Sequence, residues 1–164
     1  MMLPSYKNIF SRILISTYGV FFALIMPILY GIENSYSSYY LHDPLLLGIS
    51  LSLLGIGLWL HRNHKWTLPA IALVIVAIFD MRNPEIHNTF AFVFFLSSSW
   101  VIFLDDRFKR LGWYSLLTYS LLIIENTGIF WFEFVQIIMI SCYHIAYAYK
   151  MLKTKLMREA NDQT

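Results

Sequence analysis

Charge is scarce in this sequence. Only 13% of its 164 residues are Asp, Glu, Lys or Arg, whereas 58% are apolar. A soluble domain carries about 25% charged residues to cover its surface. Because so little charge is available here, most of the surface is expected to face lipid. Aromatic residues make up 18% of the chain, and the amphipathic rings of Tyr and Trp are typical of the headgroup level of a bilayer.

Cysteine is almost absent as well. Cys142 is the only one, so no disulfide can form within the chain and a Cys-rich metal site is excluded. The Lys and Arg residues are scattered without a basic face, which excludes a nucleic-acid partner. No polar stretch is long enough for a separate soluble domain. Residues 1–164 are therefore expected to form a single integral membrane domain.

Six apolar segments come near the length of about 20 residues that a helix needs to cross about 30 Å of hydrocarbon. They predict an all-α, polytopic membrane bundle with spans at about 12–31, 44–61, 66–81, 87–104, 112–130 and 131–150. The first is interpreted as an anchor helix, since no small-x-small signal-peptide cleavage site follows it. A tight turn near Asn126 to Gly128 separates the last two, and the polar tail 153–164 is expected to fray.

The basic residues predict the orientation. With six spans and the N-terminus inside, the cytoplasmic parts hold eleven of the 12 Lys and Arg residues: Lys7, Arg12, Arg62, Lys65, Arg107, Lys109, Arg110, Lys150, Lys153, Lys155 and Arg158. The outer parts hold only Arg82. This asymmetry follows the positive-inside rule. It predicts a protein of the cytoplasmic (inner) membrane with both termini in the cytoplasm.

The acidic residues show the opposite distribution. Six carboxylates and two His residues fall at or near the predicted outer ends of the helices: Glu33, Asp43, Asp80, Glu85, Glu125, Glu133, His42 and His87. They are either ordinary outer-loop residues or members of a structural polar network, because a charge in a membrane helix usually finds a partner inside the bundle. In that network Glu133 and Asp80 would pair with His87 and Arg82.

A third interpretation of the outer residues is a catalytic or metal-binding site. His and carboxylates bind zinc and other divalent ions. The catalytic candidates are His87, Asp80 and Glu133, and the metal-ligand candidates are His42, Asp80, His87 and Glu133. No tight spacing such as His-x-x-x-His supports the metal.

The last predicted helix carries a polar stripe. Glu133, Gln136, His144 and Tyr147 lie along one face at helical spacing. We interpret this stripe as inward packing with hydrogen bonds to neighbouring helices, and the wall of a polar pathway as the alternative. The run Ser97-Ser98-Ser99 is interpreted as a close-packing position, since no nucleophile motif surrounds it.

Several outer residues carry a family resemblance. The segment Ser35-Tyr36-Ser37-Ser38-Tyr39-Tyr40 follows the first span, His87 opens the fourth ahead of Ala91 and several Phe residues, and Glu133 opens the sixth. This pattern resembles bacterial six-helix membrane proteins with a Ser-x-Ser-x-Tyr-Tyr motif, which are similar to the DRAM and FRAG-type superfamily. The sequence departs from that pattern at Phe79-Asp80-Met81-Arg82, where the bacterial relatives tend to have Phe-Pro-Thr.

The resemblance implies a ligand site and lipid handling. Its characteristic positions, taken as ligand-binding candidates, are Ser35, Ser37, Tyr39, Tyr40, His87 and Glu133. The leading hypothesis is a membrane protein without enzymatic activity that binds or senses lipid, or supports a membrane-protein partner or a second copy of itself, through an outer polar pocket. The alternatives are a metal-dependent membrane hydrolase or lipid-modifying enzyme, and a small transporter, although the inverted repeats typical of many transporters are lacking.

Overall fold

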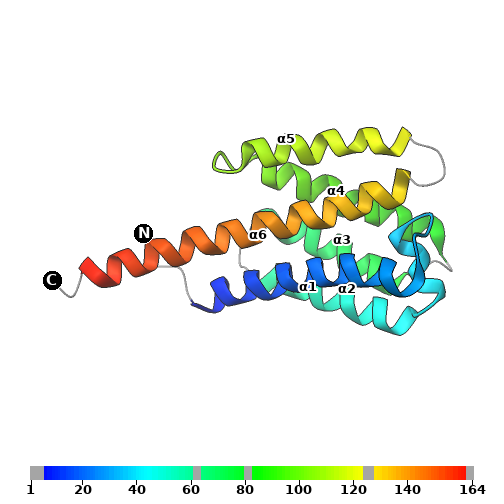
Figure 1. Ribbon diagram of the computed structural model, residues 1–164, viewed down its shortest axis with the longest axis horizontal. Coiled ribbons are helices and arrows are strands. Elements are labelled where there is room, and N and C mark those ends of the chain that lie inside the picture. The colour runs from blue at the N-terminus through cyan, green and yellow to red at the C-terminus, as the bar shows by residue number, and fades with distance from the viewer. Residues whose placement is uncertain (1–5, 61–63, 80–82, 124–127, 162–164) are drawn as a thin grey trace.

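A computed structural model describes residues 6–60, 64–79, 83–123 and 128–161 (Figure 1). These residues contain no strand, and the all-α prediction is confirmed. The α-helices are α1 (Tyr6–Tyr30), α2 (Pro44–Leu60), α3 (Thr67–Ile78), α4 (Pro84–Phe103), α5 (Lys109–Leu117) and α6 (Gly128–Asn161). Three short 3-10 helices lie between them: η1 (Tyr36–Leu41), η2 (His64–Trp66) and η3 (Thr118–Ile123).

Proline and glycine mark several helix ends. Pro44 and Pro84 each stand at the first residue of a helix, where the missing N–H costs nothing because it would have no partner within the helix. Gly31 follows α1 with a φ of +79°, a conformation that glycine adopts without strain. Its N–H donates to the Pro27 carbonyl at 3.0 Å, which ends α1 and turns the chain toward η1.

The helices differ in length from the predicted spans. α1 begins at Tyr6 and not near Arg12, so Arg12 lies within the helix and is buried. α5 ends at Leu117 and continues as η3, whereas Phe130 belongs to α6. The predicted turn at 126–127 lies outside the described residues. The prediction of a frayed tail is wrong as far as Asn161, because α6 continues to that residue.

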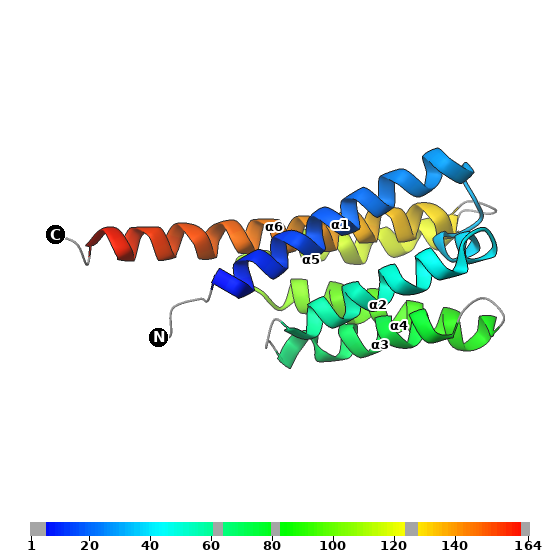
Figure 2. The same cartoon turned by 90° about the horizontal axis from the view of Figure 1, so that it is seen from below.

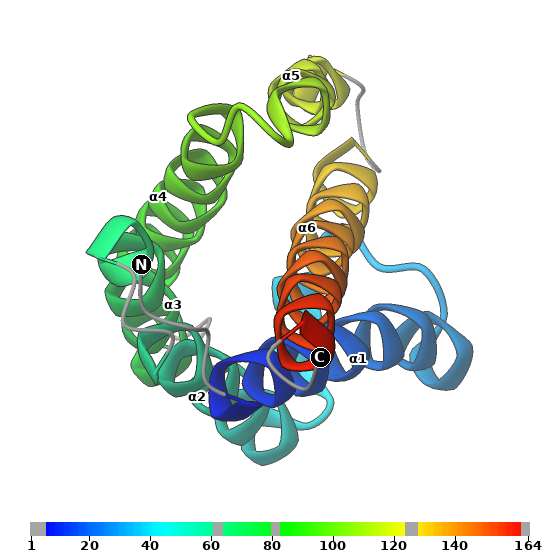
Figure 3. The ribbon, with the colours of Figure 1, turned by 90° about the vertical axis from the view of Figure 1, so that its left-hand side faces the viewer.

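The six helices stand in a ring (Figure 3). Going round it, each helix contacts its neighbour in sequence, and α6 closes the ring against α1. The first and last described residues lie at the same end of the molecule, here called the terminal end, where α6 extends beyond the other helices (Figures 1 and 2). η1 lies at the opposite end, here called the η1 end.

Close approach of the helices sets the ring. A Cβ atom added to Gly112 of α5 would lie 2.3 Å from the Phe103 Cα of α4, so only glycine allows this hairpin to close. A Cβ atom on Gly19 of α1 would lie 2.7 Å from the Ser141 hydroxyl of α6. Small residues at such contacts are typical of helix packing in membranes, where backbones must approach without a hydrophobic driving force.

The outside of the ring is apolar. Large side chains such as Ile28, Trp59 and Phe10 are mostly exposed, which suits contact with lipid chains. Three helices, α1, α4 and α6, are long and apolar enough to cross a membrane. α2 and α3 are shorter apolar helices.

Candidate functional site

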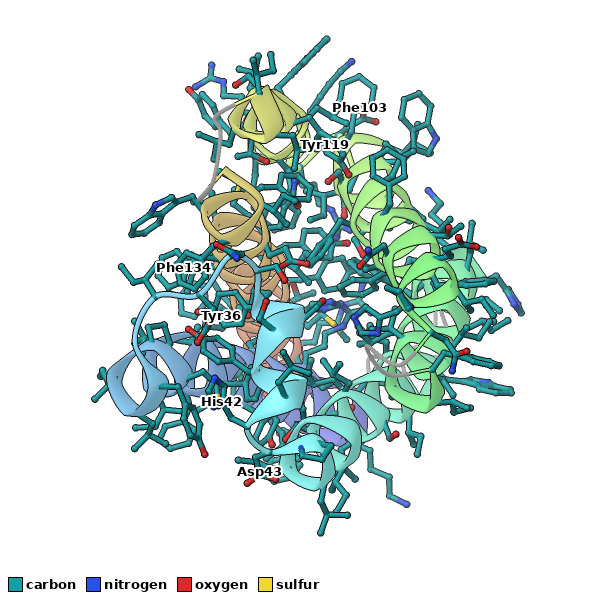
Figure 4. The ribbon with its side chains drawn as sticks, turned by 90° about the vertical axis from the view of Figure 1, so that its right-hand side faces the viewer. Tyr36, His42, Asp43, Phe103, Tyr119 and Phe134 are labelled. Atoms are coloured by element: carbon teal, nitrogen blue, oxygen red, sulfur yellow. The ribbon has the colours of Figure 1, made fainter. Side chains whose placement is uncertain are left out.

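η1 covers the end of the ring, as Figure 4 shows from that side. Its first turn is closed by the Ser38 N–H, which donates to the Ser35 carbonyl at 3.1 Å. At its other end the N–H groups of His42 and Asp43 both donate to the Tyr39 carbonyl at 3.0 Å. The Asp43 carboxylate then accepts the Leu46 N–H at 2.9 Å, which caps α2. The Ser- and Tyr-rich segment thus forms a compact connection from α1 to α2.

Glu133 of α6 reaches the start of η1. Its carboxylate accepts the Tyr36 N–H at 2.6 Å and the Ser37 N–H. The first N–H groups of a helical turn have no partner inside that turn, and a carboxylate forms short bonds with such donors. Glu133 is only 6% exposed. Among the described residues, no Lys or Arg forms an ion pair with it.

His87 of α4 contacts the same turn from the other side. Its Nδ1 lies 2.7 Å from the Phe79 carbonyl oxygen, and its Nε2 lies 2.7 Å from Ser37 Oγ. A carbonyl can only accept, so Nδ1 carries a proton; in the neutral ring Nε2 then accepts from the Ser37 hydroxyl. The imidazole is fully buried. It links η1 to the end of α3 and the start of α4.

Two Tyr side chains anchor η1 to α1. The Tyr36 hydroxyl donates to the Ala23 carbonyl, and the Tyr39 hydroxyl donates to the Gly31 carbonyl at 2.7 Å. The Tyr36 ring also stacks on Phe130 of α6 at 5.0 Å between centroids. Burial raises the pKa of Tyr39 to about 12 and that of Tyr36 further above its ordinary value. Both phenols therefore remain neutral hydrogen-bond donors at physiological pH.

A cavity of about 90 Å³ lies beneath η1, between α1, α2, α3, α4 and α6. Its walls are almost entirely apolar. Tyr36, Ser37 and Glu133 line it at the η1 end, and Ser141 lines it further along α6. Its α2 wall runs from Leu47 to Leu58, which is about 16 Å of helix. The cavity is therefore long and narrow, with hydrocarbon along its length and a carboxylate at one end.

Some of the predicted site residues lie together in the structure, and others do not. Ser37, His87 and Glu133 meet at the first turn of η1, with Tyr39 one turn further along. Glu133 and His87, which were predicted to pair, are linked through Ser37. Glu133 accepts the Ser37 N–H, and His87 bonds to the Ser37 hydroxyl. Ser35 takes part only locally, with its hydroxyl 3.2 Å from that of Ser38.

His42 lies apart from this group. Its Nε2 is 3.1 Å from the Glu33 carboxylate, and its ring stacks on Tyr30 at 5.0 Å. Asp80 and Arg82, like the side chain of Tyr40, lie outside what the structure describes. Within the described ranges, no three His, Cys, Asp or Glu side chains are grouped to hold a metal ion. The zinc site that included Asp80 stays a prediction.

The polar stripe on α6 faces inward, and Gln136 in its middle bonds to three neighbouring elements. The Gln136 amide nitrogen donates to the Ser115 carbonyl and to the Thr118 hydroxyl, both at 2.8 Å. Its oxygen accepts from the Ser115 hydroxyl at 2.8 Å, and Ser99 Oγ lies 3.2 Å from the same oxygen. These bonds join α4, α5 and η3 to α6, which agrees with the structural interpretation of the stripe.

His144 and Tyr147 belong to a second polar group, at the terminal end. Arg12 donates from Nη1 to His144 Nδ1 at 2.9 Å, and the Tyr147 ring lies 4.2 Å from the Arg12 guanidinium and 4.4 Å from that of Arg107. Arg107 in turn forms two hydrogen bonds with the Asp105 carboxylate, at 2.7 and 2.8 Å. Burial raises the pKa of the Asp105 carboxyl, but the hydrogen bonds from Arg107 outweigh it, so the net pKa is below its ordinary value.

No family model, curated protein or solved structure matches this chain. The resemblance to the DRAM and FRAG-type superfamily therefore stays a prediction. The structure adds that three of the residues that carry this resemblance, Ser37, His87 and Glu133, lie together at the end of one cavity.

Sequence reasoning missed the backbone partners of this site. The Phe79 carbonyl and the Tyr36 N–H hold His87 and Glu133 in place, yet backbone groups have no signature in a sequence. It also missed Phe130, which it placed at the end of the fifth span and which stacks on Tyr36 as part of α6. The Ser-Tyr motif itself was the signal for η1.

Proposed function

We propose that this chain is an integral protein of the cytoplasmic membrane that spans it six times, with the terminal end in the cytoplasm. The support is threefold. Three helices are long and apolar enough to cross, the helices alternate in direction around the ring, and the described basic residues cluster in the segments at the terminal end. α3 and the α5–η3 pair are short for a bilayer of about 30 Å, which a locally thinner bilayer accommodates.

We further infer that the protein binds the hydrocarbon chain of an amphiphilic lipid inside the ring. The observation that carries this proposal is the long, narrow cavity with apolar walls and a polar η1 end. Apolar cavities stay dry and take apolar guests, even where they are large enough for water. A single extended chain fits a cavity of this shape, whereas a polar solute would gain nothing from its walls.

Mass spectrometry of the protein released gently from a detergent micelle tests this proposal. The intact protein is expected to retain one lipid per chain, identified by extraction. The variant Val76→Phe places a ring in the cavity wall and is expected to lose the lipid. Ile78→Phe, two residues along the same helix, changes a side chain that is mostly exposed on the outside of the ring and is expected to keep it. Equal retention by both variants would exclude the cavity as the binding site.

One observation favours a second function, a hydrolase that acts on a lipid ester. Ser37 Oγ lies 2.7 Å from His87 Nε2 beside the cavity, which is the geometry of a nucleophile with its general base. Against it, the N–H groups of Tyr36 and Ser37 are already bonded to Glu133, so they do not serve an oxyanion. A fluorophosphonate probe decides between the two: labelling that is lost in Ser37→Ala would support the hydrolase, and its absence supports binding alone.

A further inference from the structure

We propose that Glu133 recognises the head of the bound amphiphile and that this head is a protonated amine. The inference rests on the proposed function, because it assigns the head of the chain that the cavity would hold. Among the described residues that line the cavity, Glu133 is the only Asp, Glu, Lys or Arg.

Within the part of the chain that the structure describes, Glu133 has no Lys or Arg as a counterion. Burying a carboxylate is costly unless it is hydrogen-bonded and paired. Glu133 accepts two N–H bonds from η1, but these donors are neutral, and among the described residues none of its partners is a Lys or Arg. An ionised carboxylate has about four acceptor positions, so two N–H bonds leave room for a further donor.

Glu133 is part of the cavity wall, so we expect the further donor to come from the cavity. Ser37, Tyr36 and Phe22 line the same cavity, and the Phe22 and Tyr36 rings lie 6.3 Å apart between centroids. Aromatic faces attract a cation within about 6 Å, most strongly where water is excluded. A primary ammonium group on a hydrocarbon chain would meet a carboxylate and aromatic rings at the η1 end while its chain follows the apolar walls.

Other head groups fit this end less well. A fatty-acid carboxylate or a phosphate would place a second negative charge beside Glu133, and the two like charges would repel each other. A long-chain alcohol can donate one hydrogen bond but does not neutralise the charge. The expected order of affinity is therefore amine, then alcohol, then acid, at equal chain length.

Three probes of equal chain length test this order: tetradecylamine, tetradecanol and myristic acid. Each is added to the purified full-length protein in detergent at neutral pH, and the bound fraction is measured by native mass spectrometry. We expect about tenfold or greater preference for the amine over the acid, since only the amine forms a charge-assisted hydrogen bond with Glu133. Equal binding of the three, or preference for the acid, would overturn the assignment of the head.

Two variants, each of which removes one carboxylate, test whether the preference for the amine comes from Glu133. Glu133→Gln is expected to bind all three probes with similar affinity, because the chain site remains and the charge is gone. Glu33→Gln removes a carboxylate at the same end that pairs with His42 on the surface, and it is expected to keep the preference. Loss of the preference in both variants would assign it to the general negative charge of the η1 end and contradict a site at Glu133.

The failure of this inference is distinguishable from that of the proposed function. If none of the three probes binds, the chain site itself is wrong. If all bind to the unchanged protein and none is preferred, the chain site stands and only the amine head is wrong. If E133Q cannot be recovered folded, the comparison of the three probes on the unchanged protein still decides the assignment.

Discussion

Ser37 Oγ lies 2.7 Å from His87 Nε2, although fifty residues separate the two in the chain. The contact joins the connection between α1 and α2 to the start of α4. Because Glu133 holds the backbone of the same turn from α6, three distant parts of the ring meet at one residue. The η1 end is therefore closed by polar contacts.

Replacing His87 with Ala is expected to destabilise the protein by about 2–4 kcal/mol, because it removes two buried hydrogen bonds and leaves Ser37 and the Phe79 carbonyl unpaired. Thermal unfolding in detergent measures the change. His42→Ala is the matched control, since 41% of the His42 side chain is exposed and its partner Glu33 lies at the surface. A similar loss in both variants would mean that the contacts of His87 do not stabilise the η1 end.

Replacing Gln136 is also expected to destabilise the protein. Gln136→Leu keeps the approximate size of the side chain but removes its buried hydrogen bonds to Ser115 and Thr118, at a cost of about 1–3 kcal/mol. Ser97→Ala is the control, because the Ser97 hydroxyl bonds only to carbonyls of its own helix. The midpoint of thermal unfolding compares the two. If Q136L unfolds no earlier than S97A, the polar group does not join these helices.

Gly112 tests the close approach of α4 and α5. In Gly112→Ala the new Cβ would lie 2.3 Å from the Phe103 Cα, so the helices must separate. Overpacking of this kind typically costs about 1–3 kcal/mol, and backbone contact places it at the upper end or beyond. In Gly48→Ala the nearest atom is 3.7 Å away, and little change is expected. The yield of folded protein and its unfolding temperature measure both variants.

The Asp105 carboxylate predicts a dependence of stability on pH. Its pKa is lower in the folded protein than its ordinary value, so the folded state binds fewer protons than the unfolded chain. The stability that this gives is present above the unfolded pKa of about 3.9 and is lost as the pH falls through the folded value. The unfolding temperature of the unchanged protein should therefore exceed that of Asp105→Asn at pH 6, and the gap should narrow below about pH 4.

The control for that experiment is Asp106→Asn, which alters the neighbouring, exposed carboxylate. Its unfolding temperature is expected to follow that of the unchanged protein across the same pH range. A gap between the unchanged protein and D105N that stays constant down to pH 3 would show that the pairing with Arg107 does not stabilise the fold.

Much of the fold was predictable because its signals are local. Apolar runs of helical length predicted the helices, although α4 begins at Pro84, three residues before the predicted start of that span at His87. The end of α5 was not predictable in the same way, since the change to η3 at Thr118 depends on contacts with α6. The burial of Arg12 within α1 was not predicted for a related reason. Its partners, His144 and Tyr147, stand more than a hundred residues away in the chain.

The candidate site was predictable only in its side chains. The Ser-Tyr segment, His87 and Glu133 stood out as polar residues in an apolar sequence. Their spatial relation was not encoded in any spacing, because it depends on the closure of the ring by α6 against α1. The cavity was also hidden from the sequence, since its walls consist of the same Leu, Ile and Phe residues that face lipid elsewhere.

The most direct test of a chain bound inside the ring is photo-crosslinking. A long-chain amine with a diazirine near the end of its chain is incubated with the protein in detergent, irradiated, and located by peptide mass spectrometry. The proposal predicts adducts on cavity residues away from the η1 end, such as Leu58 and Ile140, and their loss in Val76→Phe. Adducts confined to outward residues such as Trp59 and Ile78 would contradict it.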